Sequence, residues 1–285
     1  MPLLTLVILA AVQGVTEFLP ISSSGHLELT WRVMGDPNLS ENPGLAPDSE
    51  RLILFVAVHL GTLFAVALYF WRDVAALIGG GLRLLIGRGG PAARLAGCIV
   101  VGSLPLAAAG FLLKDVLLES LYNLQVIAWA TIGFAVLLYL GDRLGMTVRK
   151  VDHLTLGGAF VLGLAQALAL IPGTSRSGIT MTAARFFGFE RAEAARISLL
   201  LAIPAILGAS LLGGLELYES GNLRLGRDAG LAAALAFGTA LIAIALMMAW
   251  LRRASFTPFV IYRLGLGAVL LWWAYQEQIT LALGL

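Results

Sequence analysis

The sequence is poor in cysteine, histidine and charged residues. Its single cysteine, Cys98, cannot form an internal disulfide, which excludes a secreted fold held together by disulfides. Charged residues make up only 13% of the 285 residues and hydrophobic residues 59%, whereas soluble domains have about 25% and about 45–50%. The chain therefore has too little polar surface for a water-soluble globule, and its net charge of +2 gives no basic surface for nucleic acid. These shortages predict an all-α polytopic membrane protein, with residues 1–285 forming a single integral membrane domain.

Long apolar runs predict six transmembrane helices, because a span needs about 20 apolar residues. Five runs contain no Asp, Glu, Lys or Arg, and a sixth is interrupted by Arg263 and Glu277. Six spans place both termini on one side, and most of the 19 lysines and arginines fall on the other side. The positive-inside rule then predicts both termini outside the cell. The six runs are Leu52–Trp71, Leu95–Leu113, Leu121–Gly141, Ile197–Leu215, Ala229–Leu251 and Phe256 to about Leu283.

Two shorter apolar runs, Met1–Thr16 and Leu154–Ile171, end in segments rich in proline, glycine and serine. Irregular backbone at membrane depth is tolerated only where protein or a water-filled cavity surrounds it. We therefore expect two re-entrant helical segments rather than two further spans. A signal peptide is the alternative for residues 1–16, but the run lacks a basic segment at its start and is followed directly by Glu17.

The two re-entrant segments resemble each other. Gln13 is followed nine residues later by the residues 22–25, Ser-Ser-Ser-Gly, and Gln166 is followed nine residues later by residues 175–178, Ser-Arg-Ser-Gly. A linker and three spans follow each segment, and the two segments enter from opposite sides. This pattern predicts an inverted-topology repeat with halves of about 1–150 and 151–285, whose broken helices meet near the midplane and build a site there.

Ionisable residues at membrane depth are functional candidates, because burying them is costly. Arg176 presents a planar fork of donors that suits phosphate oxygens. Glu17 could hold a divalent metal or transfer a proton, and His26 could exchange a proton near neutral pH. Ser23 could attack phosphorus if a base lies within reach. Together these residues predict a site for a phosphate or diphosphate group within or near lipid.

Each candidate also has a purely structural interpretation. A glutamate at a membrane edge is often only solvated, a histidine is often held by structural hydrogen bonds, and serines often cap helices. The guanidinium group of an arginine in a membrane span can reach the membrane–water interface, or the residue can be one of the positive charges on the cytoplasmic side. These interpretations apply to Glu17, to His26 and His59, to Ser22 and Ser24, and to Arg176 and Arg263.

Residues 13–26, which run from Gln13 to His26, and residues 172–180, which run from Pro172 to Thr180, carry a family resemblance. They resemble the two signatures of the undecaprenyl-diphosphate phosphatase family, also called bacitracin-resistance proteins. Residues 256–263 near the C-terminus are similar to the family as well, and the number and spacing of the spans agree over nearly the whole chain.

The resemblance implies an integral membrane hydrolase of the bacterial inner membrane. Such enzymes convert undecaprenyl diphosphate to the monophosphate carrier lipid used for peptidoglycan and other envelope polymers, which confers bacitracin resistance. A divalent metal, Mg²⁺ or Ca²⁺, is implied as cofactor. The partners would be the polyprenyl diphosphate and the bilayer, without nucleic acid, and a homodimer is left open. A transporter or flippase for a polyprenyl phosphate lipid is the alternative function.

The resemblance also assigns roles to individual residues. Gln13 departs from the glutamate that often begins the first signature, and His59 stands where a glutamine is expected, so either could alter metal binding or proton transfer. The catalytic residues would be Glu17, Ser23, His26 and Arg176. The substrate contacts would be Gln13, Ser22, Ser24, Thr174, Ser175, Ser177 and Thr180. The metal ligand would be Glu17, with Gln13 and His59 as further candidates.

Overall fold

The computed structural model describes residues 3–34, 49–116, 123–219 and 227–283, and these residues are helical apart from short connections. Within them the only strand-like pairing is an isolated bridge between Arg149 and Phe189. The helices are α1 (Leu3–Thr16), α2 (Ser23–Met34), α3 (Ser49–Tyr69), α4 (Trp71–Leu85), α5 (Pro91–Val116), α6 (Leu124–Leu144), α7 (Leu156–Ala167), α8 (Arg176–Phe186), α9 (Arg191–Glu219), α10 (Arg227–Leu251) and α11 (Thr257–Leu283). Two short 3₁₀ turns, η2 (Val151–His153) and η3 (Leu168–Leu170), complete the set.

The predicted class, a polytopic helical membrane protein, is confirmed. Among the described residues five helices are long and apolar enough to cross a membrane, and a sixth span results if α3 and α4 are counted together. The chain bends by 92° between α3 and α4, so the run predicted as Leu52–Trp71 ends at Tyr69, and the sequence analysis missed α4. Met1 and Leu121, where two predicted segments begin, lie outside the described residues.

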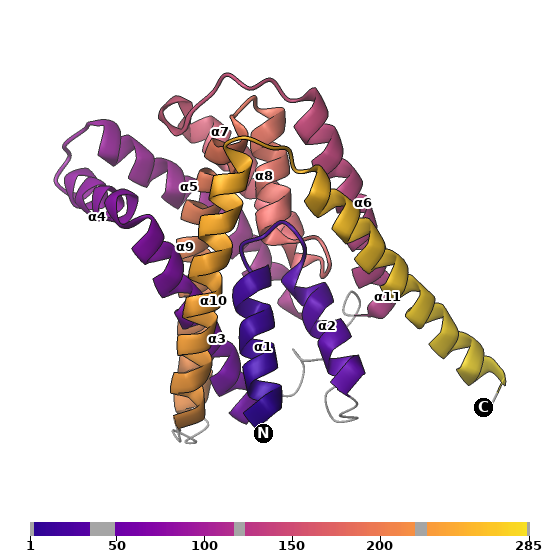
Figure 1. Cartoon of the computed structure of the whole chain (residues 1–285). Helices are drawn as coiled ribbons and strands as arrows, with labels where there is room; N and C mark the ends of the chain where they lie inside the picture. The colour runs from indigo at the N-terminus through magenta and orange to yellow at the C-terminus, as the bar shows by residue number, and fades with distance from the viewer. Residues whose placement is uncertain (1–2, 35–48, 117–122, 220–226, 284–285) are drawn as a thin grey trace.

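The two re-entrant segments form helical hairpins that enter from opposite ends of the molecule. Hairpin 1, residues 3–34, comprises α1, a turn and α2; hairpin 2, residues 156–186, comprises α7, η3, a turn and α8. In Figure 1 the turn of each hairpin lies at mid-height, and α1 begins at the same end of the molecule at which α11 finishes. Hairpin 1 packs on α10 and α11, and hairpin 2 packs on α5 and α6. This is the arrangement of an inverted repeat.

The turns of the two hairpins share an unusual local geometry. Ser22 and Ser175 both have positive φ angles, 73° and 69°, which residues other than glycine adopt rarely. The hydroxyl of Ser22 accepts a hydrogen bond from the Gly25 N–H at 3.3 Å, and that of Ser175 accepts one from the Gly178 N–H at 3.1 Å. In each turn a second serine hydroxyl, two residues on, lies 3.2 or 3.1 Å away. The repeat therefore extends to individual backbone angles, and strained backbone of this kind tends to occur at functional sites.

Glycines allow each hairpin to approach its neighbouring helix closely. A Cβ on Gly14 would lie 2.0 Å from the Thr239 hydroxyl and 2.7 Å from the Ala236 carbonyl oxygen of α10. A Cβ on Gly163 would lie 2.4 Å from the Gly102 carbonyl oxygen of α5. Helices in membranes associate through such close packing of small residues, because lipid supplies no hydrophobic force between them.

A cluster of charged residues joins the ends of four helices, α6, α8, α9 and α11, on the side of the molecule opposite the open end of hairpin 1. Asp142 at the end of α6 lies 3.4 Å from the Arg185 Nε of α8 and accepts a hydrogen bond from Arg191 Nε at 2.6 Å. Its other oxygen accepts the Phe256 N–H, just before α11, at 3.1 Å. The side chains of Asp142 and Arg185 are each only 1% exposed.

Substitution of Asp142 by alanine is expected to destabilise the protein by about 3–5 kcal/mol, since the Arg185 charge would stay buried without its partner. Asp73→Ala is the matched control. Its pair with Arg196 is more open, with side chains 15% and 33% exposed, and is expected to contribute about 1 kcal/mol or less. Unfolding of the two purified variants in detergent measures both effects, and equal losses of stability would contradict the prediction.

Candidate active site

Glu17 lies directly after α1, at the tip of hairpin 1, and is the centre of a hydrogen-bonded group. Its Oε1 accepts a hydrogen bond from Arg176 Nη2 of hairpin 2 at 3.0 Å. Its Oε2 accepts one from Gln13 Nε2 at 2.8 Å and one from the Ser23 hydroxyl at 3.3 Å. The side chains of Glu17 and Arg176 are only 9% and 15% exposed. The structure thus brings together four of the residues that the sequence singled out.

His59 reaches the same group from α3. Its Nδ1 lies 2.8 Å from the Phe55 carbonyl oxygen and must carry a proton, because a carbonyl can only accept. In the neutral ring Nε2 is then an acceptor, and it lies 3.3 Å from the Gln13 side-chain nitrogen. Gln13 and His59, the two residues expected to depart from the family signatures, therefore contact each other beside Glu17.

The serines of the two tips are engaged in structural hydrogen bonds. The Ser24 hydroxyl accepts a hydrogen bond from the Gly173 N–H of hairpin 2 at 3.0 Å. The Ser177 hydroxyl donates to the Leu19 carbonyl of hairpin 1 at 2.8 Å. Ser22 and Ser175 cap the helices that follow them. Two of the hydroxyls expected to contact substrate thus join the hairpins, and two cap helices within their own hairpin.

Thr174 and Thr180, also expected to contact substrate, differ in their surroundings. The Thr180 hydroxyl lies behind the tip, where it donates to the Arg176 carbonyl at 2.8 Å and lies 2.5 Å from the Ser198 hydroxyl. It therefore supports the first turn of α8. The Thr174 hydroxyl is buried and has no hydrogen-bond partner in the structure, which is rare for a buried polar group.

His26 lies next to this group but is bonded elsewhere. Its Nδ1 lies 2.7 Å from the Ser22 carbonyl oxygen, and its Nε2 lies 2.7 Å from the Tyr262 hydroxyl of α11. The Ser23 hydroxyl, in contrast, is bonded to Glu17. Of the two proton-transfer groups expected for Ser23, the structure places Glu17 in contact with it and His26 on the Tyr262 side.

Arg263 is a residue of this region whose place the sequence did not predict. It is fully buried, and its Nη2 donates to the carbonyl oxygens of Gly173 and Thr174 at 3.0 and 2.9 Å. The interpretation that it extends toward the membrane interface is wrong. The available signal was an arginine within an apolar span, which is costly unless it has a role.

Unpaired donors gather at the start of α8. Among the described residues the buried Arg176 Nη1, the Arg263 Nε and Nη1 and the Thr174 hydroxyl have no hydrogen-bond partner, although buried polar groups are rarely left unpaired. The N-terminus of α8 adds partial positive charge. Arg176 is paired with Glu17, while Arg263 binds only backbone carbonyls, and this excess of positive charge and of unpaired donors suits a phosphate group.

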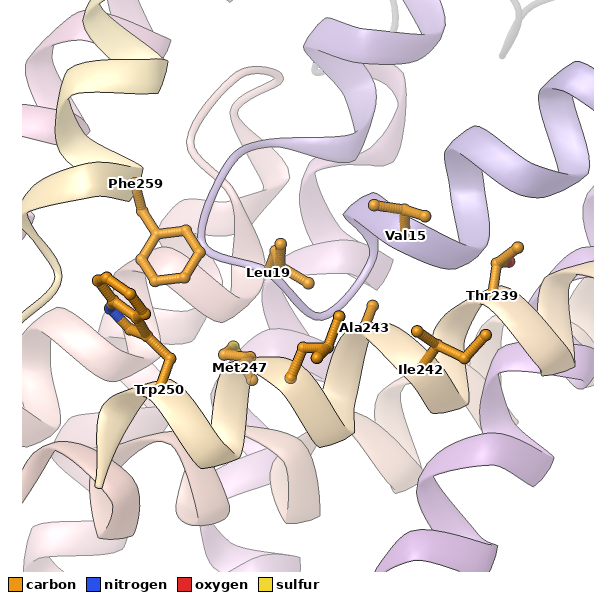
Figure 2. Close-up of a pocket in the computed structure, with 9 residues that line it drawn as sticks. Val15, Leu19, Thr239, Ile242, Ala243, Met247, Trp250 and Phe259 are labelled. Atoms are coloured by element: carbon orange, nitrogen blue, oxygen red, sulfur yellow. The ribbon is translucent and has the colours of Figure 1, made fainter. Parts of the chain in front are cut away.

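An apolar groove of about 360 Å³ lies beside the tip of hairpin 1. Figure 2 shows Val15 and Leu19 of hairpin 1 on one side, α10 side chains along the floor and Phe259 of α11 at one end. Val15 and Leu19 flank Glu17 in the sequence, so the groove lies close to the polar group. The lining residues are Val15, Leu19, Thr239, Ile242, Ala243, Leu246, Met247, Trp250 and Phe259.

Comparison with known proteins identifies the family of the chain. A family model described as bacitracin resistance protein BacA matches residues 6–269. The chain belongs to this family. Undecaprenyl-diphosphatase 1 of Rhodospirillum rubrum is 52% identical over 276 residues, which is 96% of each chain. Undecaprenyl-diphosphatases of Roseobacter denitrificans and Hahella chejuensis are 47% and 46% identical, covering 97% and 95% of this chain and 100% and 98% of theirs.

The divalent metal implied by the BacA resemblance can be tested against the residues present. Within the described part of the chain no group of three or more His, Cys, Asp or Glu residues could hold a metal ion. However, the Gln13 Oε1 is buried without a partner, one helical turn from the Glu17 carboxylate. Mg²⁺ is usually held by one or two carboxylates together with substrate phosphates and water. This donor set fits a metal ion that is shared with a phosphate substrate.

Proposed function

We propose that this protein hydrolyses undecaprenyl diphosphate to undecaprenyl phosphate and inorganic phosphate, which recycles the carrier lipid for peptidoglycan and other envelope polymers. The observation that carries the proposal is the contact of Ser23 and Arg176, from opposite hairpins, with the same Glu17 carboxylate. A transporter needs an anion site, but it does not need a hydroxyl nucleophile beside a carboxylate base. The site and the names of the relatives therefore favour the hydrolase over the flippase.

In the proposed reaction the terminal phosphate binds the free donors of Arg176 and Thr174 at the start of α8. The Ser23 hydroxyl attacks the terminal phosphorus and passes its proton to Glu17. The bond from this phosphorus to the bridging oxygen breaks, and undecaprenyl phosphate leaves. Water then attacks the phosphoserine, inorganic phosphate leaves, and Ser23 regains its proton. His26 is the second proton-transfer group.

A divalent metal, Mg²⁺ or Ca²⁺, belongs to the proposal. Glu17 and Gln13 would hold it, with His59 beside them. When bound it would neutralise charge on the phosphate oxygens, which lowers the barrier to phosphoryl transfer. Arg176 performs the same task from the other hairpin, so that the two charges would act on one phosphate.

The proposed setting is the bacterial inner membrane, with both termini outside. α1 begins at the open end of hairpin 1, and α2 begins at its tip (Figure 1). The open end of hairpin 1 lies on the same side of the molecule as the end of α11. In this orientation hairpin 1 opens to the exterior and hairpin 2 to the cytoplasm. Assembly as a homodimer stays a prediction.

The function is tested by phosphate release from undecaprenyl diphosphate by the purified protein in detergent. We expect release that stops with a chelator and returns with Mg²⁺ or Ca²⁺, and no release from undecaprenyl phosphate. The second arm places the protein in vesicles and follows movement of the labelled lipid between leaflets. Lipid movement without phosphate release under any metal condition would refute the hydrolase and support the flippase.

The groove is proposed to hold the prenyl tail, and Ile242→Trp is expected to obstruct it. Ile242 lines the groove and is 62% exposed, so a larger side chain should not disturb the core. Displacing about two methylene groups from the groove costs about 1.6 kcal/mol, which would raise KM for undecaprenyl diphosphate roughly tenfold. The KM for a three-isoprene diphosphate, whose tail is too short to fill the groove, should change less.

Leu211→Trp on α9 is the matched control, because Leu211 is 65% exposed and does not line the groove. It should leave both KM values unchanged. If Ile242→Trp raised neither KM, or raised both equally, the tail would bind elsewhere.

A further inference from the structure

The hydrogen bonds of His26 determine which of its nitrogens can act. Nδ1 lies 2.7 Å from the Ser22 carbonyl oxygen, and because a carbonyl only accepts, Nδ1 must carry a proton. Ser22 has a positive φ and begins the cap of α2, so this bond is part of the tip's own structure. Nε2 is therefore the only nitrogen of His26 that can take up and release a proton.

Tyr262 holds that nitrogen. Its hydroxyl lies 2.7 Å from Nε2, and the two rings are nearly parallel, with planes 5° apart and centroids 5.4 Å apart. In the neutral state of His26 the Tyr262 hydroxyl is the donor, because Nε2 has only a lone pair to offer. The bond thus fixes both the tautomer and the orientation of the imidazole ring.

The contacts of α11 with the hairpins restrict the position of Tyr262. The next residue, Arg263, is fully buried and binds two carbonyls of hairpin 2, so adjacent residues of α11 contact both hairpin tips. Phe259, one helical turn before Tyr262 and hence on the same side of α11, lines the apolar groove. The same side of α11 therefore contacts His26 and lines the groove.

We propose that Tyr262 is a positioning residue for His26: its hydroxyl bonds Nε2 and so fixes the imidazole ring on the first turn of α2, three residues after the proposed nucleophile Ser23. The inference rests on the proposed hydrolysis and deepens it. Tyr262 does not contact the reacting atoms and transfers no proton itself. It acts by keeping the imidazole in one tautomer and one orientation, and it releases Nε2 when that nitrogen takes a proton from the water that attacks the phosphoserine.

The test compares Tyr262→Phe, which removes only the hydroxyl, with Tyr275→Phe on the same helix. Tyr275 is exposed to a similar degree, 47% against 50%. We expect Tyr262→Phe to lower kcat for phosphate release about tenfold with KM changed less than about twofold, the size of effect expected from one hydrogen bond. Tyr275→Phe should match the unsubstituted protein.

A double-substitution cycle separates positioning from a general structural effect. His26→Asn removes the atom that Tyr262 binds but leaves a side-chain amide that can still donate to the Ser22 carbonyl. In this background Tyr262→Phe should lower kcat less than about twofold, because its partner atom is gone. A further loss of about tenfold in the His26→Asn background would show that Tyr262 acts independently of His26 and would overturn the inference.

Two further outcomes decide the matter. If His26→Asn has no measurable turnover, the comparison of Tyr262→Phe with Tyr275→Phe decides: unchanged kcat in Tyr262→Phe overturns the inference, and a selective loss of kcat supports it. The proposed function fails separately, since it would leave the unsubstituted protein without phosphate release, whereas the inference about Tyr262 fails with the unsubstituted protein active.

Discussion

Arg176→Ala is expected to lower phosphate release from undecaprenyl diphosphate at least about a thousand-fold, since arginines that stabilise a transferring phosphoryl group are worth about 10³–10⁵ in rate. Arg176 is the cation that joins the hairpins, with one nitrogen bonded to Glu17 at 3.0 Å and the other buried without a partner. The substitution removes the free donor proposed to bind phosphate. It also leaves the Glu17 carboxylate, whose side chain is only 9% exposed, without its positive partner.

Two control variants make this result interpretable. Arg176→Lys keeps the charge but not the planar fork and should recover only part of the activity. Arg253→Ala removes an exposed arginine from the turn between α10 and α11 and should leave turnover unchanged. The unfolding of each variant in detergent shows whether the fold persists. Turnover of Arg176→Ala within about tenfold of the unsubstituted protein would exclude Arg176 as the phosphate-binding cation.

Ser23→Ala is the second substitution with a large expected effect, again about a thousand-fold or more if Ser23 is the nucleophile. The Ser23 hydroxyl lies 3.3 Å from the Glu17 Oε2, close enough for the contact to tighten when substrate binds. Rapid quenching with substrate labelled on the terminal phosphate should trap labelled protein in the unsubstituted enzyme and none in Ser23→Ala.

Ser24→Ala is the matched control for the neighbouring hydroxyl. Ser24 accepts a hydrogen bond from the Gly173 N–H and braces the two hairpins, so its loss should lower stability more than it lowers the chemical step. Near-normal turnover of Ser23→Ala would instead support direct attack by water, with Ser23 only orienting the phosphate.

The location of the hairpins could be predicted from the sequence because hydropathy and helix breakers are local signals. The apolar run before Glu17 is too short to span a bilayer and ends at Pro20 and three serines, and α1 does end at Thr16. Hairpin 2 follows the same pattern. Positions 17 and 176 stood out because ionisable residues at membrane depth are costly, and positions 13 and 23 stood out through the repeated motif and the family resemblance.

Other features depended on contacts that no local pattern encodes. The bend between α3 and α4 follows an apolar run that reads as one continuous span. The Tyr262 hydroxyl meets His26 across 236 positions of sequence, and tyrosines in membrane helices are commonly interfacial anchors. Arg263 of α11 binds backbone carbonyls of hairpin 2, and because every residue has a carbonyl, the sequence around Arg263 does not indicate these partners.

By itself the sequence determined that this protein is a helical membrane protein with two broken, inverted segments, because composition, run length and helix breakers act within a few turns of chain. Only the tertiary structure decided which side chains meet: Glu17 binds Ser23 and Arg176, while His26 binds Tyr262. The reason is that Glu17 and Arg176 lie 159 positions apart, and their contact depends on how closely α1 and α7 pack on α10 and α5.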